Sequence, residues 1–262
     1  MLARKLQCGI QVAAQTLLLT AFGLGQTGTQ PMATPDTPPD VNVIVSRMSD
    51  AIAENRARVR AYSVVREYKL YGEERQKPKT ELRAKIEFLP PDNKSYNILT
   101  STGGVGEHVV RKILDHEIDL SRDPATSEMS AANYNFKLVG IEKRNDRQCY
   151  VLEASPRRQD RSLIKGRVWI ETSTFHIVHV EGSPTRSPSF WTRDVWLSLD
   201  FAEVEGMWLQ TATHATARVR LIGAFNLEGR DQSYQLSHGQ TAVAAKHQNR
   251  RGSAIVVAGV VK

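Results

Sequence analysis

Four histidines are the first residues to consider as metal ligands, because imidazole commonly binds zinc and other transition metals. His176 and His179 stand three positions apart in a run typical of a β-strand, where side chains three apart point to opposite faces unless a bulge intervenes. His108 and His116 stand eight apart in a helical pattern, which separates them by about two turns. Neither pair is expected to share one ion, so we predict no metal site.

Covalent or acid–base catalysis has no recognisable pattern in the sequence. The G-x-S-x-G nucleophile elbow, a paired-carboxylate signature and a Cys-His signature are all missing. A Ser-His-acid set stays open, because such residues meet in space and not in sequence. Cys149 lies in a strand-like run, where a lone cysteine is typical of the buried core, and a reactive thiol is the alternative. We expect no catalytic residue, no cofactor and no enzymatic activity.

A glycine-rich turn, Gly103–Gly106, precedes a helical pattern and could bind phosphate at the start of that helix. The strand, loop and Lys-Ser/Thr pattern that completes a phosphate loop does not accompany it. A plain turn is therefore the favoured interpretation.

The elements that would position a site are clearest between Leu163 and Trp208. Apolar residues there alternate with polar ones in short runs separated by turns, a pattern typical of an antiparallel meander with one covered face. The predicted strands of this meander are Leu163–Glu171, Phe175–Glu181, Arg193–Phe201 and Met207–Thr213.

The rest of the chain either extends this sheet or covers it. Two amphipathic helices are predicted, Val41–Arg60 with Asp40 as its N-cap and Glu107–Leu120. No proline-rich linker or break in composition divides the strands, which favours one sheet. The further strands are Tyr62–Tyr71, Glu81–Leu89, Ser95–Leu99, Tyr134–Lys143, Gln148–Ser155, Thr216–Ile222 and Asn226–Leu236.

These elements predict a mainly antiparallel α+β fold with about eleven strands. A sheet this long must curl, and two helices do not fill a closed barrel, so an open half-barrel with helices over its concave face and an apolar hollow is expected. Strand parity groups the residues that would line the hollow but does not say which face is concave. The candidate lining residues are Ile86, Phe88, Val168, Ile170, Val195, Leu197, Leu199 and Phe201.

The N-terminal residues 1–25 are typical of an export signal. Arg4 and Lys5 precede the mostly apolar run Ile10–Leu24, which is too short for a permanent membrane span. Cys8 precedes this run, whereas a lipid-modified cysteine would follow it. After cleavage only Cys149 would remain, so no intramolecular disulfide could form.

Residues 26–40 are rich in Pro, Thr and Gly and are expected to form a flexible leader before a domain of residues 41–236. Residues 237–262 are basic and end in an apolar run, which is expected to be a disordered tail or one more edge strand. The formal net charge of +7 is consistent with solubility or with attraction to anionic headgroups or phosphates. Basic residues are not interleaved with aromatic ones, so no nucleic-acid partner is expected.

Four segments of the chain resemble a known family of proteins. They are Tyr134-Asn-Phe-Lys-Leu-Val-Gly140, Cys149-Tyr-Val-Leu-Glu-Ala-Ser-Pro156, Lys165-Gly-Arg-Val-Trp-Ile-Glu171 and Ser187-Pro-Ser-Phe-Trp191. Together with the order of elements, they resemble the outer-membrane lipoprotein-sorting proteins, the LolA-like half-barrels that include LolB and the N-terminal part of RseB.

The resemblance implies a periplasmic protein that carries lipid or lipoprotein acyl chains in an apolar cavity, with the helices as a lid. An alternative is a ligand-sensing or regulatory module that docks a protein partner and transports nothing. Membrane-associated proteins are the expected protein partners, and the chain is expected to be a monomer. The helical insertion near Gly103–Asn133 and the tail after Leu236 depart from the short carriers of this class.

Overall fold

The computed structural model describes residues 38–74, 76–187, 192–219 and 223–236. The chain divides into two units, Met1–Pro38 and Pro39–Lys262, and the fold described below belongs to the second. The predicted export signal, most of the leader and the C-terminal tail therefore lie outside the described residues, as do Phe190 and Trp191 of the family-like segment.

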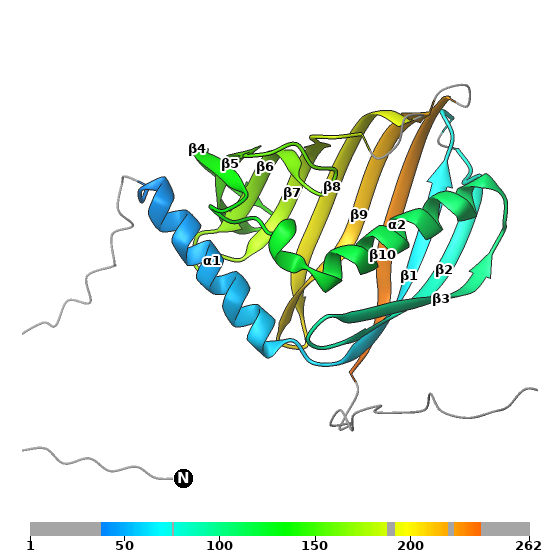
Figure 1. The fold of residues 1–262 in the computed structure, drawn as a ribbon, viewed down its shortest axis with the longest axis horizontal. Coiled ribbons are helices and arrows are strands. Elements are labelled where there is room, and N and C mark those ends of the chain that lie inside the picture. The colour runs from blue at the N-terminus through cyan, green and yellow to red at the C-terminus, as the bar shows by residue number, and fades with distance from the viewer. Residues whose placement is uncertain (1–37, 75, 188–191, 220–222, 237–262) are drawn as a thin grey trace, which may run out of the picture. The chain divides into compact units, whose positions relative to one another are not determined.

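Ten antiparallel strands form one sheet in the order β3-β2-β1-β10-β9-β8-β7-β6-β5-β4 (Figure 1). Strands β4 to β10 follow one another as a single meander, and the hairpins β1–β2–β3 join it through the pairing of β1 with β10. The strands are β1 (Tyr62–Tyr71), β2 (Thr80–Leu89), β3 (Asn93–Ser101), β4 (Tyr134–Arg144), β5 (Arg147–Pro156), β6 (Ile164–Glu171), β7 (Ile177–Pro184), β8 (Thr192–Val204), β9 (Met207–Val219) and β10 (Gly223–Leu236).

Two long helices accompany the sheet. Helix α1 (Val41–Arg58) precedes β1, and the side chain of Asp40 caps it by accepting a hydrogen bond from the backbone N–H of Asn42 at 2.7 Å, as predicted. Helix α2 (Val105–Arg122) connects β3 to β4 through a short 3₁₀ helix, η1 (Pro124–Thr126). Gly104 stands at the start of α2 with φ of 80°, a conformation that favours glycine.

Both helices lie on the same face of the sheet, which the strand register shows directly. Residues that face each other on neighbouring antiparallel strands share a face. One such row crosses the whole sheet, and α1 packs near its Val168 end whereas α2 packs near its Tyr68 end. The row is Leu138, Leu152, Val168, Val180, Leu199, Thr213, Gly229, Tyr68, Leu82 and Ser101.

We call the face that carries the helices the inner face and the opposite one the outer face. Figure 1 views the helices in front of the sheet, with α1 toward β4–β7 and α2 across β10, β1 and β2. The predicted class, an open antiparallel half-barrel with helices on its concave face, is confirmed.

The described residues form ten strands, where about eleven were expected. The predicted strand Met207–Thr213 and the described part of the predicted strand Thr216–Ile222 belong to one strand, β9, which is continuous through His214 and Ala215 to Val219. No glycine or proline interrupts this stretch, so nothing forces a turn there. Among the described residues, no helix combines the length and the apolar character needed to cross a bilayer.

Candidate functional site

Helix α1 covers an apolar cluster at one end of the inner face. Ile44 and Met48, both 0% exposed, pack against Val168 and Ile170 of β6, which are also 0% exposed. Val45, Tyr150, Leu152 and Val180 complete the buried part, and the partly buried Leu199 and Phe201 extend it toward the middle of the sheet. Every buried member of this cluster except the tyrosine is purely apolar.

The C-terminal part of α1 is held to the sheet by Asn55. Its amide donates a hydrogen bond to the carbonyl of Trp208 at 2.8 Å and accepts one from the N–H of Trp208 at 2.7 Å. These reciprocal bonds join the C-terminal part of the helix to the start of β9.

Helix α2 covers a second apolar cluster at the other end of the inner face. Val110 and Leu114 of the helix are buried against Tyr68, Leu82 and Ile86 of the sheet. The remaining buried members of this cluster are Val64, Leu70, Ala84 and Leu227.

Next to the α2 cluster lies a buried network of charged side chains. The guanidinium of Arg66 forms an ion pair with Asp231 of β10 and a second one, of 2.9 Å, with Glu117 of α2. Lys94 of β3 lies 2.6 Å from the other carboxylate oxygen of Glu117, and Tyr234 donates a hydrogen bond to Asp231. The Arg66 and Asp231 side chains are only 7% and 1% exposed, whereas the Glu117 side chain of α2 is 24% exposed, so the network ties α2 to the sheet at the margin of the buried region.

The surroundings of this network shift the pKa values of its members. Burial raises the pKa of Glu117, but the nearby charges of Arg66 and Lys94 lower it by more, so its pKa lies below the ordinary 4.5. Burial raises the pKa of Tyr62 and that of Tyr68 to about 12, which keeps both phenols protonated. Glu117 and Arg66 are thus charged together at neutral pH.

Between the two helix-covered ends, the inner face is less covered. Of the side chains described in β8 and β9, Met207 alone is buried. The register places Thr213 and Ala215 of β9 on the inner face, beside Leu197 and Leu199 of β8. We call this part the central strip, and its members, all partly buried, are Leu197, Leu199, Phe201, Thr213, Ala215 and Phe225.

The floor of the central strip is made of small residues. Thr213 faces Gly229 of β10, and a Cβ on Gly229 would come within 3.0 Å of the ring of Tyr68. The ring of Tyr68 therefore lies over this glycine at the edge of the strip. Leucines and phenylalanines of β8 and β10 flank these small residues, so this part of the inner face is mainly apolar.

The structure divides the predicted lining residues among these regions. Val168 and Ile170 are buried beneath α1, and Ile86 is buried beneath α2, so none of the three is available in this conformation. Phe88 is partly buried and lies 5.6 Å, between ring centroids, from Tyr62.

The four predicted residues of β8 lie nearest the central strip. Leu197, Leu199 and Phe201 are partly buried and belong to it. Val195 stands beside an irregularity of β8 between Arg193 and Trp196. Sequence reasoning missed the β9 and β10 members, although the alternation in β9 could have indicated Thr213 and Ala215.

The outer face carries its own cluster, formed by Cys149, Val151, Trp169 and Val178. The cysteine is 0% exposed, which confirms the prediction of a buried core residue, and burial raises the pKa of its thiol.

His179 is 1% exposed and its Nδ1 lies 2.7 Å from the carboxylate of Asp200, whose pKa this hydrogen bond lowers. His176 lies instead against Trp208, with ring centroids 4.6 Å apart in a tilted arrangement.

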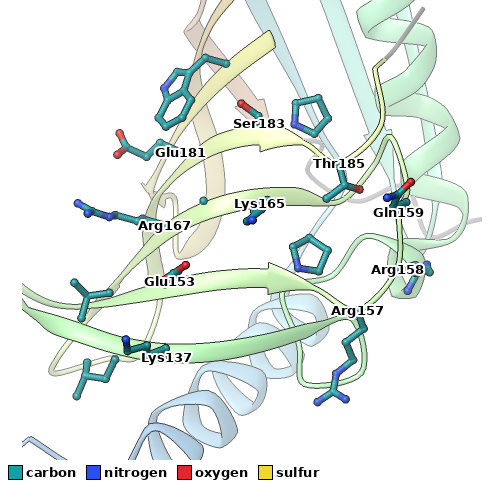
Figure 2. A pocket seen from close by; sticks show the side chains of 16 residues that line it. Lys137, Glu153, Arg157, Arg158, Gln159, Lys165, Arg167, Glu181, Ser183 and Thr185 are labelled. Atoms are coloured by element: carbon teal, nitrogen blue, oxygen red, sulfur yellow. The ribbon is translucent and has the colours of Figure 1, made fainter. Parts of the chain in front are cut away.

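A polar groove of about 1290 Å³ lies on the outer face, over β4 to β8 (Figure 2). Figure 2 shows Lys137, Glu153, Arg167 and Glu181 arising from neighbouring strands, and the register places them in one row. They alternate along their strands with the inner-face residues Leu138, Leu152, Val168 and Val180, so this row points away from the helices. Sequence reasoning did not identify this groove.

Comparisons with known families give one match. The profile of a family of unknown function, DUF5686, matches residues 126–234, which is less than half of the chain and covers the meander from β4 into β10. No curated protein sequence matches the chain.

Several solved structures are similar in fold. An outer membrane lipoprotein-sorting protein domain from Vibrio parahaemolyticus has 13% identity and a TM-score of 0.41, covering 74% of this chain and 93% of its own. A LolA superfamily protein from Nitrosomonas europaea has 13% identity and a TM-score of 0.40, covering 78% and 96%. MucB in the MucA/MucB complex of Pseudomonas aeruginosa has 11% identity and a TM-score of 0.23, covering 74% and 99%.

Two of these three structures belong to the class that the sequence segments resemble. All three TM-scores lie below 0.5, so the half-barrel rests on the strand order and register of this chain, and the function must be argued from its own surfaces.

Proposed function

We propose that the protein is an exported carrier that binds the acyl chains of lipids or lipoproteins along the central strip of its inner face. The observation that supports the proposal is the strip itself: half-buried apolar side chains above a floor of Thr213 and Ala215, between two helices that each cover only one end of the sheet. The resemblance of the sequence to the lipoprotein-sorting proteins motivates this choice of ligand.

Burial of an acyl chain in such a strip is favourable without any charged partner. Each methylene removed from water contributes about 0.8 kcal/mol, and release into a membrane returns a similar amount. Movement of α1 or α2 would extend the strip over the side chains that the helices now cover, including Val168 and Ile86. The ligand would then replace contacts that the helix makes in the empty protein.

Binding of a pyrene-labelled long-chain fatty acid tests the proposal. Ala215→Trp fills the strip, and loss of contact for two methylenes weakens binding by about 1.6 kcal/mol, or more than tenfold. Thr216→Trp is the matched control, because the neighbouring position faces the outer side of the same strand. Equal binding by both variants, or no binding by the unchanged protein, would contradict the proposal.

The second candidate function is a regulatory module that docks a protein partner. It is favoured by β4, an edge strand of the sheet on which Val139 and Ile141 are 48% and 43% exposed. A partner could add a strand to this edge through backbone hydrogen bonds. Absence of fatty-acid binding, together with slower amide exchange in β4 on addition of a membrane extract, would favour this function over transport.

A further inference from the structure

The outer groove contains cationic side chains that form no ion pair with the described part of the chain. Lys137, Lys165 and Arg167 line it and, within the described part of the chain, have no ion-pair partner. Other cations of the same face are paired, since Arg147 lies 3.0 Å from Glu171 and Arg144 lies 3.5 Å from Asp200. The three unpaired cations are therefore not required by the sheet and are available to a ligand.

The groove has an excess of positive charge. Five cations line it, Lys137, Arg157, Arg158, Lys165 and Arg167, against the two carboxylates Glu153 and Glu181. The register places Glu153 between Lys137 and Arg167, and Arg167 between Glu153 and Glu181, so the carboxylates interrupt the positive surface at regular intervals. A concave surface of this kind attracts a ligand that is mainly acidic but mixed in charge.

The shape of the groove favours an extended polypeptide over a flat lipid surface. It crosses five strands, which at about 4.8 Å per strand gives a length of about 19 Å, the span of about six residues of extended chain. Trp196 lines the groove on β8 and is 45% exposed, and Val139 lines it on β4. Exposed aromatic side chains of this kind commonly anchor protein partners.

We propose that the outer groove between Val139 and Trp196 docks an extended acidic segment of a protein partner. Acidic side chains of the segment would pair with Lys137, Lys165 and Arg167, and its apolar side chains would pack on Trp196. This surface lies on the opposite face from the central strip, so this proposal and the acyl-chain proposal can fail separately.

Fluorescence anisotropy with a labelled peptide of alternating Glu and Thr tests the proposal on the full chain. The unchanged protein binds this peptide and not its Lys-Thr counterpart, and added salt weakens the binding because it screens exposed charges. Lys165→Gln/Arg167→Gln weakens binding about tenfold, and Trp196→Ala weakens it as well. The circular dichroism spectra and the urea midpoints of these variants stay unchanged, which shows that they are folded.

The matched control is Lys77→Gln/Arg83→Gln. It removes the same formal charge from exposed positions on and near β2, at the other end of the sheet. Equal losses in the two double variants would overturn the proposal, because binding would then reflect net charge alone. Stronger binding to phosphatidylglycerol vesicles than to the peptide, lost in Lys165→Gln/Arg167→Gln, would also overturn it in favour of a membrane-docking surface.

Discussion

Helices α1 and α2 are of equal length, 18 residues each, and lie on the same face of one sheet, but the side chains beneath them differ in kind. Beneath α1 the buried contacts are almost entirely apolar, with Ile44 and Met48 at their centre. Beneath α2 an apolar cluster is joined by the ion network of Arg66, Asp231 and Glu117. Apolar contacts are non-directional and independent of pH, whereas a buried ion network depends on geometry and on protonation.

The difference matters for a carrier because a lid must move without the protein unfolding. An apolar helix face can slide onto a bound acyl chain, which offers it similar contacts. A helix held by ion pairs cannot move in this way at low cost, because its separation from the sheet leaves a charge without its partner. We therefore expect α1 to be the more mobile lid and α2 to be the fixed one.

The largest expected effect comes from removal of Arg66. Arg66→Ala leaves Asp231, whose side chain is 1% exposed, buried without its cation, and this lowers the free energy of unfolding by about 3–5 kcal/mol. Urea denaturation followed by circular dichroism measures the loss. Arg83→Ala, which removes an exposed arginine of β2, changes stability by less than about 0.5 kcal/mol.

Removal of both charges sharpens this prediction. Arg66→Met/Asp231→Leu recovers much of the stability that Arg66→Ala loses, because no uncompensated charge stays buried. A double variant as unstable as the single one would show that the network contributes through its own attraction rather than through the cost of leaving one member alone.

A smaller and chemically different loss is expected beneath α1. Met48→Ala removes a fully buried side chain and leaves a cavity, which lowers the free energy of unfolding by about 2–4 kcal/mol. Val43→Ala is the matched control on the same helix, because Val43 is 45% exposed and its truncation leaves no cavity. Similar losses in the two variants would mean that the inner side of α1 is not packed as described.

Much of this arrangement could be predicted from the sequence. Alternation of apolar and polar residues predicted nearly every strand, and Asp40 was correctly predicted as the N-cap of α1. Parity also grouped Leu197 with Leu199 correctly, because side chains two apart in a regular strand share a face. The same reasoning does not place Val195 or Phe201, because register irregularities of β8 separate each of them from this pair.

The ion network could not be predicted, because its partners come from distant parts of the chain. Arg66 alternates with Val64 and Tyr68 in the sequence, which indicates an inward position, but Asp231 lies 165 residues away and Glu117 lies on a separate element. The outer groove was missed for a similar reason, since Lys137, Glu153 and Arg167 become neighbours only through the strand order.

The smallest predicted effect is a pH dependence of stability that differs between the contacts of α2 and those of α1. The pKa of Glu117 is lower in the folded chain than its ordinary value of 4.5. The charged Glu117 therefore stabilises the fold fully at pH values above 4.5, and this stabilisation is lost as the pH falls through the lowered pKa. Glu117→Gln should lower the free energy of unfolding by about 1–3 kcal/mol at pH 7, and the difference from the unchanged protein should shrink below about pH 4.5.

Urea denaturation at pH 7 and at successively lower pH measures this difference, with Glu87→Gln as the control at a carboxylate that is 56% exposed. The loss caused by Met48→Ala should stay constant over the same range, because no titrating group is removed. A loss at Met48 that shrank with falling pH as much as the loss at Glu117 would show that acid loosens the whole inner face at once. The contrast between a fixed α2 and a mobile α1 would then be wrong, and both helices would have to be treated as one lid.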